Sequence, residues 1–350
     1  MHPALRRAGL VVCLLSLLGI VPGVLRGLEP ARPATRFAAA IEQLSEAEGA
    51  FDTDNLVSNE KSYLDVIPAL VSGHVSGGAY IGVGPDQNFS YIARVRPTFA
   101  YIIDVRRDNL LLHLLFKALF AQARNRAEYL SLLTGRPVPD GPERWSSATL
   151  EEIVAHVDRS APGPGASRGL RSRLDRTIEG FGVPLARADL ETIERFHQTF
   201  ITSGLDLQFQ SHGRRPNDYY PTFRELLLAT DANGRQWNYL ASEEDFQFVK
   251  SLEARDAIIP VVGNVSGPRA LRAIGAAVAE RREHVSAFYI SNVEFYLDRD
   301  GAFGRFVDNL SRLPRDGRSV MIRSVFGRGS SVSLVQSIDG TIAEASRVPR

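Results

Sequence analysis

The sequence predicts an α/β fold, a doubly wound and mostly parallel sheet that carries a helical and hairpin insertion. One observation is a buried strand, a tight turn, a helix and a second buried strand between residues 79 and 103. A second is the return of the same alternation between residues 257 and 336. Strands that alternate with helices favour a parallel sheet covered by helices. The chain has 350 residues, 44% of them hydrophobic, and is long enough to bury such a core.

Composition excludes several classes of protein. The 41 basic residues almost balance the 40 acidic ones, whereas a protein that binds nucleic acid through phosphates usually has a basic excess, so we expect no nucleic-acid partner. The single cysteine, Cys13, excludes an intrachain disulfide and a cysteine zinc site. The histidines are scattered without ligand spacing, and we expect no metal site. The motifs of serine hydrolases and P-loop NTPases are missing.

The first residues predict a signal peptide or a membrane anchor over residues 1–27. Arg6 and Arg7 precede an uncharged, apolar stretch from Ala8 to Leu25, which is the pattern of a secretory signal. Residues 28–36 then read as a linker. We therefore expect a protein that is exported, periplasmic or secreted, or anchored by this segment, which is its only expected contact with a membrane. The protein is cytoplasmic if the segment is not a working signal.

The first part of the core is predicted over residues 37–134. Apolar runs bounded by turn residues predict strands, and apolar residues at helical spacing predict helices. The predicted strands are 79–83 and 99–103, and the predicted helices are 37–48, 63–71, 88–95 and a single long helix over 109–133.

Residues 135–255 are predicted to be a mostly helical insertion. Proline, glycine and arginine accumulate from residue 135 to residue 182, as they do in loops. The predicted elements are helices over 150–157 and 190–202, a hairpin turn at Asp231–Gly234 between 223–229 and 236–240, and a helix capped by Ser242 that ends near Ala254.

The second part of the core is predicted over residues 256–340. It repeats the alternation of buried runs and helices, and Pro268 suits the first turn of a helix. The predicted strands are 257–262, 285–290, 319–324 and 332–336, and the predicted helices are 268–282 and 302–313.

A glycine turn joins the first predicted strand to its helix. Gly82 and Gly84, followed by Asp86 and Gln87, would let a ligand approach bare backbone at a helix N-terminus. A dinucleotide fingerprint has a third glycine where this chain has Gln87, so NAD and FAD are disfavoured. Asp104 ends the next strand, where a carboxylate can accept hydrogen bonds from both hydroxyls of a ribose. The alternative is a tight structural turn, with Asp104 as the cap of the next helix.

Two later strands also end in polar residues. Asn264 follows the strand over 257–262, and Asn292 and Glu294 follow the strand over 285–290. In open α/β sheets, ligands bind outside the carboxyl ends of the strands, where the strand order reverses. We therefore expect Gly84, Asp104, Asn264 and Asn292 to gather at one edge of the sheet.

This arrangement resembles the class I S-adenosylmethionine-dependent methyltransferase fold, and the runs 77–92, 104–109 and 291–296 also look like a bacterial family of unassigned function. The resemblance implies a Rossmann-like core that binds S-adenosylmethionine or a related nucleoside. It places Gly82, Gly84 and Gln87 at the amino-acid moiety, Asp104 at the ribose, Asn264 at the base, and Asn292 and Glu294 at the acceptor. The chain departs from the pattern at Asn264, where an aspartate is common, and in its large insertion.

Two further residues are candidates for substrate binding. Glu60 precedes the first strand, and its segment could fold over the site or cap the next helix. Arg107, beside Arg106, could bind an anionic substrate or form structural ion pairs. Glu294 and Glu60 are the candidates for a base. The competing function is a non-enzymatic exported or envelope-associated binding protein on the same scaffold.

Overall fold

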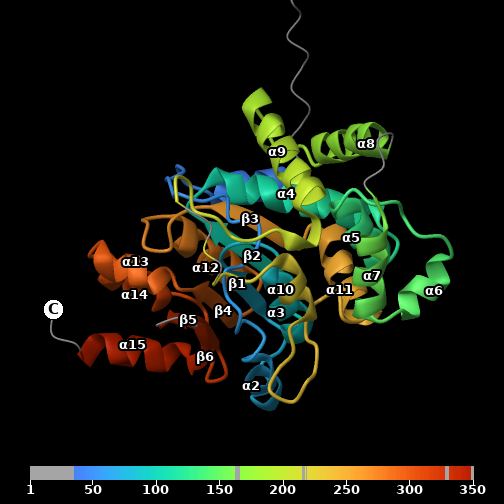
Figure 1. Cartoon of the computed structure of the whole chain (residues 1–350). Coiled ribbons are helices and arrows are strands. Elements are labelled where there is room, and N and C mark those ends of the chain that lie inside the picture. Colours follow the sequence, from blue (N-terminus) through green and yellow to red (C-terminus); the bar gives the residue numbers. More distant parts are fainter. Residues whose placement is uncertain (1–34, 162–165, 215–216, 218, 328–330, 348–350) are drawn as a thin grey trace, which may run out of the picture. The chain divides into compact units, whose positions relative to one another are not determined.

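A central six-stranded sheet organises the computed structural model, which describes residues 35–161, 166–214, 217, 219–327 and 331–347 (Figure 1). Its strands are β1 Ala79–Gly82, β2 Phe99–Asp104, β3 Ile258–Val262, β4 Val285–Ser291, β5 Val320–Phe326 and β6 Ser331–Ser337. The strand order is β3-β2-β1-β4-β5-β6. All neighbouring pairs are parallel except β5 and β6, which are antiparallel. The prediction of an α/β fold with a mostly parallel sheet is confirmed.

The strand sequences suit their places in the sheet. Every residue of β1 and β3 is buried, as expected of strands covered on both faces. Pro260 lies within β3, and it cannot donate a hydrogen bond to a neighbouring strand. Because β3 is at an edge of the sheet and pairs only with β2, the proline is accommodated there.

Helices fill the connections between the strands. Those of the first part are α1 Arg36–Leu44, α2 Ile67–Ser72, α3 Gln87–Val95, α4 Arg107–Gln122 and α5 Arg126–Leu133. Between β2 and β3 follow α6 Pro142–Ser147, α7 Leu150–Arg159, α8 Ala166–Gly180, α9 Arg187–Ser203, the 3₁₀ turn η1 Gly204–Asp206, α10 Phe223–Leu228 and α11 Glu243–Ala254. The last helices are α12 Ala270–Glu280, α13 Val293–Arg299, α14 Phe303–Leu310 and α15 Ile338–Arg347.

The helices that follow the strands pack onto the sheet. Helix α3 contacts β1 and β4, α4 contacts β2 and β3, and α12 contacts β2. Helices α8 and α9 pack against α4, and α6 and α7 against α5 (Figure 1). Most of the inserted helices therefore lie on other helices, which leaves the carboxyl ends of β1 to β4 accessible to the loops that follow them.

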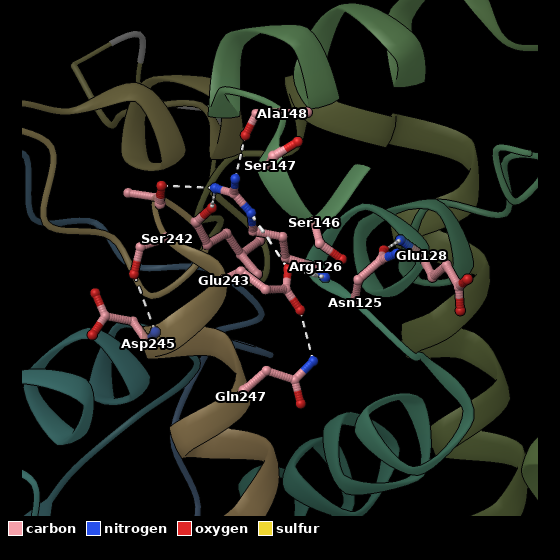
Figure 2. A network of polar contacts seen from close by, with 12 residues as sticks. Asn125, Arg126, Glu128, Ser146, Ser147, Ala148, Ser242, Glu243, Asp245 and Gln247 are labelled. Atoms are coloured by element: carbon pink, nitrogen blue, oxygen red, sulfur yellow. Dashed lines mark hydrogen bonds and ion pairs between the residues drawn. The ribbon is translucent and has the colours of Figure 1, made fainter. Parts of the chain in front are cut away.

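The single helix predicted over residues 109–133 is two helices, α4 and α5. Asn125 separates them, and its side chain accepts a hydrogen bond from the backbone N–H of Glu128 at 2.9 Å. Such an N-cap competes with helix continuation. The next residue, Arg126, is buried, and its guanidinium donates to the carbonyl oxygens of Leu240, at 2.8 Å, and Ala148. Figure 2 shows Arg126 between these segments, so the break ties α5 to two parts of the insertion.

The predicted turn at Asp231–Gly234 is present, with a single antiparallel bridge between Thr230 and Gln236. The segment before it is helix α10. Thr222 and Glu225 form a capping box at its start, and such a box stabilises a helix.

The predicted signal peptide or anchor at residues 1–27 lies outside the described residues, and so does the linker up to residue 34. Among the described residues, no helix combines the length and apolar character needed to cross a membrane.

Candidate functional site

A cavity of about 480 Å³ opens at the carboxyl ends of β1, β2, β3 and β4. Five of the residues predicted for the site line it, and they follow four different strands: Gly84, Gln87, Asp104, Asn264 and Asn292. Further walls come from residues 50–59, from the loop around Phe209 and from helix α13. The strand ends therefore meet as their sequence positions predict.

The glycine turn after β1 presents bare backbone to this cavity. Gly84 has φ +81°, a conformation that favours glycine. A Cβ at this position would meet Asn55 Nδ2 and Gln87 Nε2, each at 3.3 Å. Buried His113 holds the turn from behind, with its Nε2 3.0 Å from the carbonyl oxygen of Gly84. Gly82 is required for packing, because a Cβ at this position would lie 1.9 Å from Asn88 Oδ1.

The two polar residues that end the turn point to different places. The Gln87 amide nitrogen donates to Tyr289 Oη at 3.2 Å, and its Oε1 is buried without a hydrogen-bond partner among the described residues. The Gln87 side chain lines the cavity, with this acceptor atom buried behind its surface. Asp86 does not line the cavity. Its carboxylate faces Tyr239, 3.4 Å away, and burial raises the pKa of Asp86 to about 7.

Asp104, at the end of β2, is paired with an arginine two residues along the chain. Its Oδ1 accepts from Arg106 N at 2.9 Å and Nε at 3.0 Å, and its Oδ2 accepts from Nη2 at 2.7 Å. A carboxylate offers about four acceptor positions, so roughly one remains for a ligand, on Oδ2. Hydrogen bonds from both hydroxyls of a ribose would need two such positions.

Arg106 also fixes the segment over residues 50–59. Its Nη1 donates to the carbonyl oxygen of Thr53 at 2.7 Å, and Thr53 Oγ1 donates to the carbonyl oxygen of Gln210 at 2.6 Å. These bonds hold the segment against the strand ends. Sequence reasoning missed this role because it depends on contacts between distant parts of the chain.

Asn264, after β3, is exposed at the cavity. Its side-chain oxygen accepts from the backbone N–H and the hydroxyl of Ser266, both at 2.9 Å. Its amide N–H₂ has no hydrogen-bond partner among the described residues, so the group it offers to a ligand is a donor.

Ser291 ends β4 and lines the cavity beside Asn292. Its hydroxyl donates to Oε1 of Glu60, whose side chain is fully buried. The hydroxyl of Ser324, on β5, donates to Oε2 of the same carboxyl group. Burial raises the pKa of Glu60, and these hydroxyls oppose the rise only in part. Sequence reasoning named Glu60 but not Ser291, although a polar residue directly after a buried strand was a usable signal.

A second cavity, of about 780 Å³, adjoins the first. Both are lined by Phe51, Asn59, Phe209, Asn292 and Tyr296, among others. Glu294 lines the second cavity and not the first, and its Oε2 accepts from Arg323 Nε at 2.5 Å.

Arg107 lines neither cavity. It forms two hydrogen bonds to the carboxylate of Asp189 on α9, each at 2.9 Å. The sequence left open whether Arg107 binds an anionic substrate or forms a structural ion pair. The structure has the ion pair, with Asp189 as the partner.

A comparison with protein families adds a relationship. The family described as Domain of unknown function (DUF7790) matches residues 55–139 and 211–342. The chain belongs to this family. The matched segments contain all six strands and most residues that line the two cavities, whereas α7, α8 and α9 lie between them. No curated protein matches the chain significantly.

Proposed function

We propose that this protein binds S-adenosylmethionine or a related nucleoside in the cavity at the strand ends, on a doubly wound, methyltransferase-like core. The strand order supports the proposal. It runs outward in both directions from the neighbouring strands β1 and β4, and in open α/β sheets ligands bind at such a reversal. The cavity, at about 480 Å³, has the size of sites that hold small molecules and cofactors.

The observation that carries the proposal is the unpartnered oxygen of Gln87 beside the Gly84 turn. A buried acceptor without a partner costs free energy unless a ligand or water donates to it. An ammonium or amine of the ligand would supply that donor. The bare backbone of Gly84 lets the ligand come close to Gln87, whose side chain must turn to present this oxygen to the cavity.

The other strand ends suit the remaining parts of a nucleoside. The free acceptor position of Asp104 Oδ2 suits one ribose hydroxyl, and the amide N–H₂ of Asn264 suits a ring nitrogen of the base. Bound S-adenosylmethionine would supply an activated methyl group. The protein's part in a transfer would then be mainly to hold donor and acceptor in line.

Isothermal titration of the full chain with S-adenosylmethionine and S-adenosylhomocysteine tests the proposal. We expect micromolar binding, about −8 kcal/mol. Asp104→Asn keeps a contact to Arg106 but removes the charge, and it should weaken binding at least about tenfold, the usual effect of losing a hydrogen bond to a charged group.

The matched control is Asp189→Asn, which alters an arginine-paired carboxylate outside the cavity and should leave affinity unchanged. The proposal would be overturned if a folded wild-type chain gave no heat with either ligand. That outcome would favour the non-enzymatic binding protein.

A further inference from the structure

Glu60 is a buried carboxyl group without a counter-charge. Its side chain is 0% exposed, and among the described residues it is bound by hydroxyl groups rather than by any basic side chain. Tyr80 on β1, Tyr91 on α3 and Tyr289 on β4 lie near it, the Tyr289 hydroxyl within hydrogen-bond contact, and burial raises the pKa of each well above its usual value, so they stay neutral. Burying an unpaired carboxylate is costly, which makes such a group a candidate for a functional role.

The carboxyl group lies between the two cavities and reaches each through one hydroxyl. Ser291 lines the first cavity and donates to Oε1, while Ser324 lines the second cavity and donates to Oε2. Glu60 itself lines neither. Each serine hydroxyl therefore offers a path for a proton between one cavity and the carboxyl group.

The backbone at Ser291 is held in an unusual conformation. Its φ is +56°, a left-handed value at a strand end, whereas Arg96 and Arg282 adopt similar values at the ends of helices, where they are common. The pairing of β4 with β5 also shifts between Tyr289 and Ser291, so that Ile290 is an extra residue. Bulges of this kind re-aim side chains next to active sites, and here the bulge turns the Ser291 hydroxyl toward Glu60.

The second cavity has walls that suit an aromatic ring. Phe51 and Tyr296 form an edge-to-face pair with centroids 5.0 Å apart, and Phe209 and Tyr220 form another at 5.1 Å. Phe295, on the same wall, is 65% exposed. Aromatic side chains pack favourably on aromatic ligands.

We propose that the second cavity binds an aromatic molecule with a hydroxyl group, and that Glu60 takes the proton of that hydroxyl through Ser324. The assignment of this molecule as the acceptor rests on the function proposed for the first cavity. The O–H bond of the ligand breaks, and its proton joins Ser324 Oγ while the proton of Ser324 moves to Glu60 Oε2. Ser324 ends unchanged, the ligand oxygen becomes an anion, and the carboxylate becomes a neutral acid. Glu60 acts through Ser324 and is thus a positioning residue, not one that touches the ligand.

The test uses 4-nitrophenol, whose phenolate absorbs visible light and whose neutral form does not. It is added to the full chain in a series of buffers from mildly acidic to mildly alkaline, because Glu60 can take the proton only where it is a carboxylate, and the absorbance of the bound probe is recorded at each pH. We expect binding to raise the ratio of phenolate to phenol about tenfold over the free probe, the effect of one pKa unit.

Glu60→Gln should bind the probe with similar affinity, and Ser324→Ala should bind it more weakly because the hydroxyl that faces the ligand is gone; both variants should lose this rise in phenolate. The matched control is Ser333→Ala, because the Ser333 hydroxyl lies 3.4 Å from Ser324 Oγ but does not contact Glu60; this variant should keep the rise. The proposal is overturned if both variants keep it, or if the wild-type chain shows no saturable binding. Titration with S-adenosylhomocysteine on the same proteins reports on the first cavity separately, so the two proposals fail independently.

Discussion

The ends of β2 and β4 hold two acidic side chains that the fold treats in opposite ways. At β2, Asp104 is neutralised by Arg106 through three hydrogen bonds. At β4, Glu60 is held by the hydroxyl groups of Ser291, Ser324 and Tyr289. Breaking a buried ion pair leaves an uncompensated charge and is costly, whereas a carboxyl group held by hydroxyls can take up a proton and remain buried. The end of β2 therefore carries an ion pair, and the end of β4 carries a carboxyl group that can exchange a proton.

Removing the partner of the fixed carboxylate should have the largest effect. Arg106→Ala leaves the Asp104 carboxylate without its ion-pair partner and removes the hydrogen bond that holds the segment over residues 50–59. We therefore expect a loss of about 3–5 kcal/mol in the free energy of unfolding. Urea denaturation measures it. A loss below about 1 kcal/mol would show that the ion pair between Asp104 and Arg106 contributes little to stability.

Asp86 extends the comparison to a second buried carboxyl group that has no basic partner among the described residues. Burial raises its pKa from 3.8 to about 7, so the native state holds a proton that the unfolded state has lost. Its contribution to stability is full below pH 3.8 and declines as the pH rises toward 7, by at most about 1.4 kcal/mol per pH unit. Asp86→Asn should gain stability relative to the wild-type chain across this window. Thermal denaturation at several pH values measures the difference in stability between the variant and the wild-type chain. A difference that does not change with pH would contradict a raised pKa for Asp86.

Glu60→Gln should show the same trend with pH. Burial raises the pKa of Glu60, so the folded protein holds a proton on this group more tightly than the unfolded chain does. The resulting contribution to stability is full below the pKa that Glu60 has in the unfolded chain, and it declines as the pH rises. We expect Glu60→Gln to match the wild-type chain within about 1 kcal/mol at acid pH, the usual range for a single neutral hydrogen bond, and to be the more stable protein at alkaline pH. If the variant were strongly destabilised at every pH, Glu60 would be a charged structural residue like Asp104.

The smallest effect is expected for the neighbouring arginine. Arg107 is a third exposed and its pair with Asp189 lies outside both cavities. Arg107→Ala should therefore cost no more than about 1 kcal/mol and leave nucleoside binding unchanged. This variant serves as the control for Arg106→Ala in the same denaturation series. Equal losses of stability in the two variants would show that the Arg106 pair is no more important to the fold than the Arg107 pair.

Much of the fold follows from local patterns in the sequence. Strand positions were predicted to within about two residues, because apolar runs end abruptly at residues such as Asp104 and Gly263. The same logic placed Gly84, Gln87, Asp104, Asn264 and Asn292 around one cavity, since the carboxyl ends of parallel strands share an edge. The break at Asn125 was missed, because the apolar residues on both sides of it continue a helical pattern.

The chemistry around the predicted residues depends on contacts that no local pattern contains. Arg107 is paired with Asp189, 82 positions away in the sequence, and Ser324 reaches Glu60 across 264. The φ of Ser291 arises from the bulge between β4 and β5. Sequence reasoning could therefore locate the cavity but not the charge state of the groups around it.

The most direct test of the central claim is hydrogen–deuterium exchange of the full chain with and without S-adenosylhomocysteine. The account predicts slower exchange in three places, namely residues 50–59, the turn from Gly82 to Gln87 and the end of β2 at Asp104–Arg106, with little change in β6. Slower exchange confined to other parts of the chain, or none at a ligand concentration that saturates the titration, would contradict a nucleoside site at the ends of these strands.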